Sequence, residues 1–174
     1  MIIPIHDIIF FVSRYNGVVV HQSNVVIGHS ETEFCIERNV CIKHVQEMQK
    51  RDQDDRLWVD IGPNFLISGN GLIFEGRGAN VQGSMIKNYN HLSITIMFIG
   101  NYERDKTCPE QFHHLAILLD ELVDKTILSS NYRVLGYCQM APPSVSPGPN
   151  VMDKLPEMDN WHSGQADNIH CVRH

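Results

Sequence analysis

The chain has 174 residues, of which 43% are hydrophobic and 20% are charged. This length and composition predict a single soluble globular domain over residues 1–174, which can bury roughly two thirds of its unfolded surface without a structural metal. The formal net charge of −6 at pH 7 excludes nucleic acid as an expected partner, because phosphate binding needs a clustered basic surface and the sequence has no long basic run.

The chain begins with an apolar run at residues 8–12, which is far shorter than the ~20 apolar residues that span a bilayer. Asp7 and Arg14 bracket this run and no small-residue cleavage site follows, so the run predicts a buried strand rather than a signal peptide. If the protein is secreted or membrane-anchored, its targeting segment is expected outside this chain, which would suit an ectodomain.

The next segments predict a strand, a loop and a helix. Residues 17–21 contain the β-branched run VVV, typical of a buried strand, and the polar residues 22–34 predict a loop. Apolar residues recur at near-helical spacing over residues 36–50, which predicts a first helix. A highly charged turn follows at residues 51–56.

A hairpin and a central strand are predicted in the middle of the chain. Apolar residues 65–67 and 72–74 flank a turn that contains Asn70 and Gly71, and both of these residue types tolerate the positive φ angles of hairpin turns. Residues 93–100 (SITIMFIG) are apolar on both faces, as expected of a central strand that is covered on two sides.

The second half of the chain contains the clearest helix. Thr107 and Glu110 fit a capping box, and Pro109 suits the first turn. The residues with helical spacing that predict its buried stripe are Phe112, Leu115, Leu119, Leu122 and Val123.

Three further elements complete the predicted fold. Residues 132–138 predict a strand, residues 141–149 a proline-rich loop, and residues 151–158 a short last helix. The sum of the elements predicts an α/β fold with a mixed central β-sheet flanked by helices.

Five cysteines bear on the cellular compartment. Cys35 and Cys41 are close enough in sequence to close a small loop, as secreted domains often do. Cys108 and Cys138 are a possible second pair, which would leave Cys171 in a polar tail, whereas a cytosolic location would leave all five as free thiols.

The ten histidines do not predict a metal cluster. His113 and His114 are adjacent and would point in different directions from a helix, and the other histidines share no ligand spacing. They are expected at the surface or in hydrogen bonds.

Two segments carry a resemblance to a known family. Residues 58–67 (WVDIGPNFLI) resemble the W-x-D-I-G-Y-N-F-L-I signature of peptidoglycan recognition proteins, and residues 75–81 resemble the E-G-R-G-W-N segment of that family. Later family segments follow in order at residues 98–102, 129–132, 146–148 and 161–162, so the resemblance covers about residues 18–162 and leaves 163–174 as a polar tail. It implies the zinc-amidase (N-acetylmuramoyl-L-alanine amidase type 2) fold and a disulfide between Cys35 and Cys41.

The resemblance also implies that amidase chemistry has been lost. The family's enzymes hold Zn²⁺ with two His and one Cys and leave an open position for an activated water. Matched position by position, the ligands fall on His21, Tyr137 and Ser146, and the assisting tyrosine falls on Pro63. One good ligand of three does not hold zinc, because neutral hydroxyls are weak zinc ligands. No catalytic residue, metal or other cofactor is therefore expected, and His21 is a residual ligand position.

Four residues are predicted to contact ligand or partner: Arg56, Trp58, Arg77 and Asn90. In the family, a Gly-Trp pair and an arginine distinguish proteins that read diaminopimelate, and this chain has Leu57-Trp58 and Arg77 at those positions. A guanidinium can bind the extra carboxylate in a bidentate pair. The alternative is that Arg77 pairs with a nearby acid such as Glu75 or Asp60.

Other positions predict a weakened groove. The family's donors and aromatic walls are replaced here by Gln22, Asp52, Pro63, Ala79 and Met85. Each lost hydrogen bond is worth about 1 kcal/mol, and Asp52 is expected to add a negative charge facing an anionic stem peptide.

This pattern is most similar to the ectodomain of insect LC-type immune receptors, in the variant (a) that looks unable to dock ligand conventionally. The resemblance implies an extracellular, non-catalytic domain in innate immunity, on a single-pass receptor or secreted. It would pair with a sibling ectodomain loaded with a muropeptide (tracheal cytotoxin) and start Imd-type signalling. The alternative is a scavenger or receptor domain that binds peptidoglycan fragments directly in its own groove.

Overall fold

The fold is built on one mixed β-sheet, described in a computed structural model that covers residues 2–4, 22–164 and 171. The strand order is β1-β4-β3-β5-β2-β6, and all neighbours pair in parallel except β3 and β4. The strands are β1 (Ile2–Pro4), β2 (Gln22–His29), β3 (Phe65–Ile67), β4 (Ile73–Glu75), β5 (Ser93–Phe98) and β6 (Leu128–Gly136). This confirms the predicted α/β class and mixed sheet.

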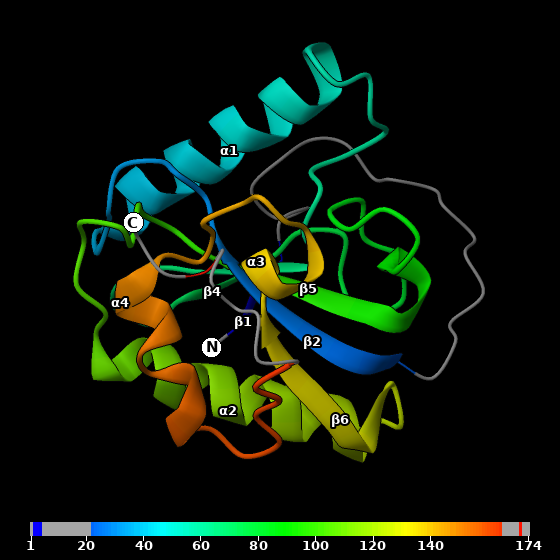
Figure 1. Ribbon diagram of the computed structural model, residues 1–174. Helices are drawn as coiled ribbons and strands as arrows, with labels where there is room; N and C mark the ends of the chain where they lie inside the picture. The colour runs from blue at the N-terminus through cyan, green and yellow to red at the C-terminus, as the bar shows by residue number, and fades with distance from the viewer. Residues whose placement is uncertain (1, 5–21, 165–170, 172–174) are drawn as a thin grey trace.

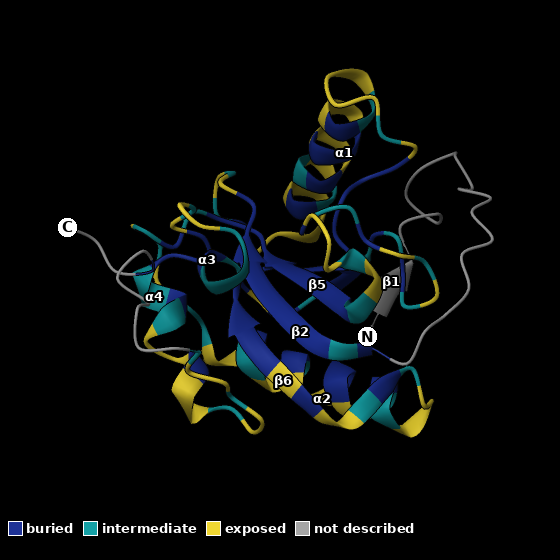
Figure 2. Ribbon diagram, turned by 45° about the vertical axis from the view of Figure 1, so that its right-hand side comes forward, coloured by how far each residue is buried: buried dark blue, intermediate teal, exposed yellow. Residues whose placement is uncertain are grey.

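Strand β2 corrects the sequence prediction, because Gln22–His29 was expected to be part of a polar loop. It lies between β5 and β6 in the sheet, and Figure 2 shows it as buried along most of its length. Its buried residue Asn24 has a partner across the sheet: the side-chain oxygen accepts hydrogen bonds from Arg133 at 2.9 and 3.2 Å. A polar residue whose partner is far away in the sequence is easily mistaken for part of a loop. The strands predicted at residues 8–12 and 17–21 lie outside the described residues.

Helices cover both faces of the sheet and give three layers (Figure 1). Helix α1 (Arg38–Asp54) packs on one face, and α2 (Pro109–Asp124) packs on the other. The short helices are η2 (Asn90–Leu92), α3 (Tyr137–Met140), α4 (Pro149–Met152) and η3 (Leu155–Glu157). Across the described ranges, no helix has the length and apolar character needed to cross a membrane.

Several predicted boundaries move. Helix α1 continues to Asp54, so most of the expected charged turn at residues 51–56 is helical. The last predicted strand begins earlier, at Leu128, and ends at Gly136, where α3 begins. The predicted last helix over residues 151–158 is divided into α4 and η3.

The start of α2 is one residue later than predicted. Cys108 is the N-cap, and its backbone N–H donates to Oε1 of Gln111 at 3.0 Å, so Gln111 takes the part expected of Glu110. The apolar stripe is confirmed: Leu115, Leu119 and Leu122 are buried, and the two other members pack against the same core. The stripe was predictable because helical periodicity is a local property.

The hairpin of β3 and β4 is confirmed, with Ile67 opposite Ile73. Its loop is longer than a two-residue turn. Gly71 has a φ of +79°, as expected at this position, and its N–H donates to the carbonyl of Ser68 at 2.9 Å.

Two disulfides connect the chain. Cys35 and Cys41 are bonded, as the resemblance implied. The possible pair of Cys108 with Cys138 is wrong: Cys138 is bonded to Cys171 and Cys108 is free. The bond therefore ties the polar tail to the end of β6, across a sequence separation of 33 residues.

Candidate functional site

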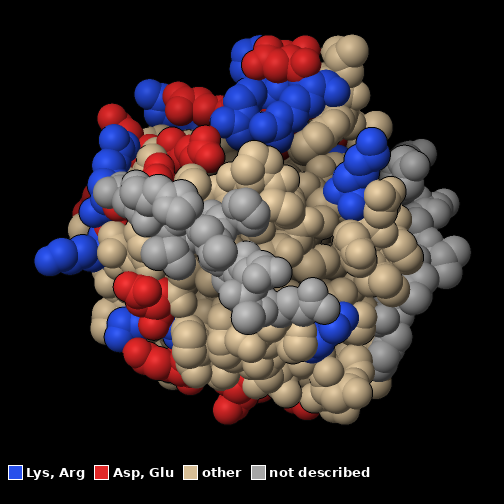
Figure 3. All heavy atoms as spheres, viewed as in Figure 1, with Lys and Arg blue, Asp and Glu red and all other residues tan. Residues whose placement is uncertain are grey.

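A small groove of about 150 Å³ lies on the α1 side of the sheet, near the C-terminal ends of β2 and β6. The C-terminal half of α1, the end of β2, and Tyr137 and Ser146 form its walls. The carboxyl ends of parallel strands commonly carry the binding sites of α/β folds. Figure 3 shows Lys and Arg side chains along α1, with Asp and Glu side chains among them.

The end of β2 reaches the position where zinc ligands would have to converge. Oγ of Ser146 accepts a hydrogen bond from the His29 N–H at 2.9 Å. A Cβ atom added to Gly28 would lie 3.2 Å from that oxygen and 2.3 Å from Sδ of Met97. Position 28 therefore points at Ser146 but has no side chain, and Met97 fills the space. His21, the predicted ligand position, lies outside the described residues.

The sequence offered two similar runs for this strand, VVVHQS at residues 18–23 and VVIGHS at residues 25–30. The prediction used the first run, and the structure brings the second to Ser146. The available signal was the VVI run at residues 25–27, whose three residues are completely buried.

His29 faces away from the position-28 side of the strand. Its Nδ1 accepts a hydrogen bond from the Tyr102 N–H at 3.0 Å, and its side chain is fully buried. Burial lowers the pKa of His29, although the carboxylates of Glu31, Glu103 and Asp105 oppose this shift. A neutral imidazole that accepts through Nδ1 carries its proton on Nε2. Neither ring nitrogen of His29 is therefore left with a lone pair for a metal.

Tyr137 also has a partner within the protein. Its hydroxyl donates a hydrogen bond to the carbonyl of Met85 at 2.8 Å. Burial raises the pKa of the Tyr137 hydroxyl, and the positive charge of Arg56 acts in the opposite direction. The phenol is therefore neutral at physiological pH and is already used to hold the segment around Met85 against the groove.

These donors do not fit a zinc ion. A catalytic zinc site needs three imidazole, thiolate or carboxylate ligands around an open position. Tyr137 and Ser146 offer neutral hydroxyls, which are weak ligands, and Gly28 offers none. Within the described ranges, no group of three or more His, Cys, Asp and Glu residues is placed to hold a metal. Pro63 is buried and has no hydroxyl to assist a reaction.

The negative charge of Asp52, which was expected to face the ligand, has partners within the protein. Its side chain is 1% exposed, and Oδ2 accepts a hydrogen bond from the Gly62 N–H at 2.8 Å. Oδ1 lies 3.1 Å from an Arg56 nitrogen and 3.7 Å from Nε of Arg51. The guanidinium of Arg56 in turn lies over the Trp58 ring, 4.8 Å from its centroid. Asp52 therefore lines the groove as predicted, but two neighbouring cations offset the negative charge of its carboxylate.

The other predicted contact residues are engaged in loops. Arg77 donates to the main-chain oxygens of Ile61 at 2.7 Å and of Asp60 and Gln82 at 3.2 Å each. Asn90 accepts a hydrogen bond from the Ile86 N–H at 2.7 Å. These main-chain contacts give Arg77 a structural role, and they differ from the ion pair with Glu75 or Asp60 that was the alternative prediction.

Of the four predicted contact residues, the structure brings Arg56 to the groove wall. The apolar part of that wall is formed by Met48, Met85 and Met97, which come from α1, a loop and β5. The family resemblance had already placed Met85 in the groove, whereas sequence reasoning missed Met48 and Met97. No local spacing connects these two methionines, so no sequence pattern pointed to them.

Comparisons with known proteins agree with this architecture. Residues 12–149 match the N-acetylmuramoyl-L-alanine amidase family. Peptidoglycan-recognition protein SC2 of Drosophila melanogaster is 35% identical over 141 residues, which are 81% of this chain and 76% of that protein.

Two solved structures are similar over nearly the whole chain. Bumblebee PGRP-SA has a TM-score of 0.89 at 27% identity, with 94% of this chain and 98% of that chain covered. The ectodomain complex of PGRP-LCa and PGRP-LCx with tracheal cytotoxin gives a TM-score of 0.83 at 32% identity, with 92% and 98% covered. From the matched residues, the fold and these similarities, we conclude that the chain belongs to the peptidoglycan recognition protein family, within the N-acetylmuramoyl-L-alanine amidase fold.

Proposed function

We propose that this chain is a non-catalytic, extracellular recognition domain of innate immunity that responds to a diaminopimelate-type muropeptide. Similar proteins support the ligand class: PGRP-LE was solved with tracheal cytotoxin, described as a monomeric diaminopimelic acid-type peptidoglycan, and the PGRP-LCa and PGRP-LCx ectodomains were solved with the same molecule. Two disulfides suit an oxidising compartment, either in a secreted form or in a receptor ectodomain.

The packing of Met97 against Gly28 is the main observation that supports the proposed absence of amidase activity. A first ligand at position 28 would need the volume that Met97 occupies. The hydroxyls of Tyr137 and Ser146 are already hydrogen-bonded within the protein. Without a metal to lower the pKa of a bound water, the groove has no means of forming the nucleophile.

Reconstruction of the metal site tests this part of the proposal. The variant Gly28→His/Met97→Ala/Tyr137→His/Ser146→Cys should gain stoichiometric zinc binding in calorimetry, whereas the wild type should show none. The matched control Tyr137→His/Ser146→Cys keeps His21 as its candidate first ligand and should not bind zinc tightly. Release of stem peptide from muropeptide by the wild type in added zinc would contradict the absence of activity.

We further propose that the chain acts with a sibling domain that holds the muropeptide. Its groove of about 150 Å³ is below the ~300–1,000 Å³ typical of small-molecule sites. Beside Trp58, the side chains of Leu57 and Val59 are 84% and 59% exposed, and exposed apolar side chains of this size suit a protein interface. The ligand would complete that interface, so ligand binding and pairing would strengthen each other. Pairing on a receptor would start Imd-type signalling.

A mixing experiment tests the pairing. This chain, the PGRP-LE domain and tracheal cytotoxin are combined, and complex size is measured by light scattering after gel filtration. We expect a ternary complex that needs all three components. Leu57→Glu should weaken it about tenfold or more, as charge placed in an apolar contact does. Ile117→Glu, a matched change on α2 at 51% exposure, should leave assembly intact.

Direct binding in the groove is the second candidate function. It is favoured by Arg51 and Arg56 at the groove wall, since guanidinium groups attract the carboxylates of a stem peptide. Calorimetry of the isolated chain with tracheal cytotoxin separates the two functions. Clear one-to-one binding without a sibling would reject the pairing proposal.

A further inference from the structure

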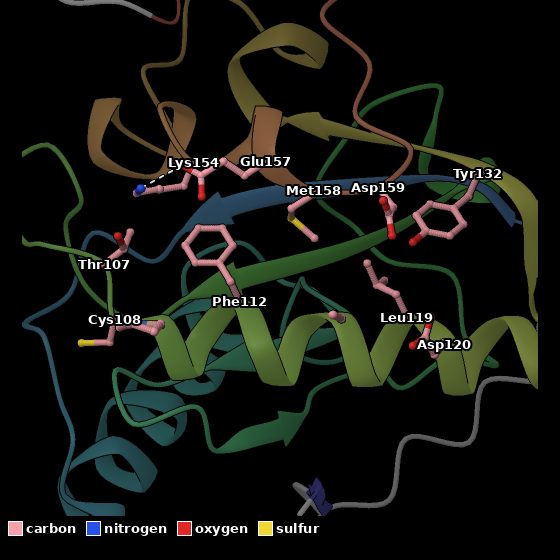
Figure 4. Close-up of a pocket in the computed structure, with 12 residues that line it drawn as sticks. Thr107, Cys108, Phe112, Leu119, Asp120, Tyr132, Lys154, Glu157, Met158 and Asp159 are labelled. Carbon is pink, nitrogen blue, oxygen red and sulfur yellow. Dashed lines mark hydrogen bonds and ion pairs between the residues drawn. The ribbon is translucent and has the colours of Figure 1, made fainter.

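A second, larger cavity lies on the opposite face of the sheet, between α2, β6 and residues 154–159 (Figure 4). Its volume is about 510 Å³, compared with about 150 Å³ for the groove. This volume is within the range of ~300–1,000 Å³ that is typical of small-molecule sites. Nothing in the proposed function uses this face.

The middle of the cavity is apolar and firmly supported. Phe112 and Met158 face each other across it, with Leu119 further along the same helix (Figure 4). Leu119 is 1% exposed. The Phe112 ring packs edge-on against Phe98, with centroids 5.3 Å apart and an interplanar angle of 77°. The apolar wall is therefore held in place by the core and does not need a ligand to form.

One end of the cavity is acidic. Figure 4 shows Asp120 and Asp159 beside the hydroxyl end of Tyr132. Burial is the main cause that raises the pKa of Tyr132, and the two carboxylates raise it further against a hydrogen bond with Asn160. In the part of the chain that the structure describes, no Lys or Arg forms an ion pair with either carboxylate.

The opposite end has its charges already matched. There, Nζ of Lys154 donates to Oε1 of Glu157 at 2.8 Å. The cavity thus joins an apolar body to one acidic end whose two carboxylates form no ion pair with a described Lys or Arg. An anionic ligand would be repelled at that end, whereas a cation would gain charge-assisted hydrogen bonds.

We propose that this cavity binds a small organic cation, with its protonated amine at Asp120 and Asp159 and its aromatic or aliphatic body against Phe112, Leu119 and Met158. Volume, preformed apolar wall and charge all point to this class of ligand. The site is independent of peptidoglycan recognition on the other face, so its failure would leave the proposed function untouched.

A series of three probes of similar shape tests the charge requirement. Calorimetry or NMR titration with 2-phenylethylamine should show binding. The neutral 2-phenylethanol should bind about tenfold more weakly, and 3-phenylpropionate should not bind. Equal binding of the amine and the alcohol, or no binding of the amine up to 10 mM (roughly the weak limit for a fragment), would overturn the proposal.

Variants locate the site. Asp120→Asn/Asp159→Asn should weaken binding of 2-phenylethylamine about tenfold or more, and Ala116→Trp, which fills the cavity from the exposed side of α2, should abolish it. The matched control Asp124→Asn/Asp153→Asn removes the same charge from exposed positions outside the cavity and should bind as the wild type does. Equal loss in both double variants would refute a local site. Binding of tetralysine without binding of the amine would replace the small molecule by a basic protein segment and would also overturn the proposal.

Discussion

Replacing Gly28 by alanine should destabilise the protein through one identifiable contact. The added Cβ would lie 2.3 Å from Sδ and 2.8 Å from Cε of Met97, a side chain that is 3% exposed. Overpacking of this kind costs about 1–3 kcal/mol. Met97→Ala alone should cost about 2–5 kcal/mol through the cavity it leaves. In the double variant, the alanine at position 28 extends into that cavity, so the overpacking cost should disappear.

Urea unfolding followed by circular dichroism measures the effect as a double-mutant cycle. We expect Gly28→Ala and Met97→Ala to couple by about 1–3 kcal/mol, with the double variant more stable than the sum of the single changes predicts. The control cycle pairs Met97→Ala with Gly136→Ala, whose Cβ would meet Met152 instead. That cycle should be additive within about 0.5 kcal/mol. Additivity in both cycles would refute the conclusion that Met97 occupies the space of a ligand at position 28.

Three other predictions follow from contacts of the described residues. Removing the second disulfide with Cys138→Ser/Cys171→Ser should lower the free energy of unfolding by about 4 kcal/mol, as the loop-entropy relation gives for 33 residues. The Tm should fall by about 10 °C. The control Cys108→Ser changes the free cysteine and should have no such effect. Burial lowers the folded-state pKa of His29, so its contribution to stability is present above pH 6.5 and is lost as pH falls through the folded pKa. The free energy of unfolding should therefore depend less steeply on pH in His29→Gln than in the wild type. Identical slopes in the two proteins would contradict the assignment. Arg77→Ala should lower the free energy of unfolding by about 2–3 kcal/mol, because it leaves main-chain oxygens of Asp60, Ile61 and Gln82 without their donor. Thermal unfolding measures this loss. Unchanged thermal unfolding together with impaired ternary assembly would instead assign Arg77 to the ligand.

The elements that could be predicted from the sequence are those whose patterns involve residues close together in the chain. The stripe of α2 and the Asn70-Gly71 hairpin depend on neighbours within a few residues, so they could be predicted with no knowledge of the fold. The family motifs at residues 58–67 and 75–81 were equally accessible, and with them the disulfide between Cys35 and Cys41.

The full set of residues that line the groove could be learned only from the tertiary structure. Strand β2 was missed because it contains polar residues that suggest a loop. One of them, Asn24, is buried in the sheet with a hydrogen bond from Arg133, a residue 109 positions later in the chain. The side chains of Met48, Met85 and Met97 meet from three separate segments, and the bond from Cys138 to Cys171 needs the tail to return to the end of β6.

The register of β2 shows the physical reason most directly. Successive residues of a strand point to opposite faces, so a shift of one position moves a side chain across the sheet. Position 28 therefore faces the groove with no side chain, while the imidazole of His29 faces Tyr102 and the core. The pairing of β2 with β5 and β6 sets this register, which a local sequence pattern does not determine.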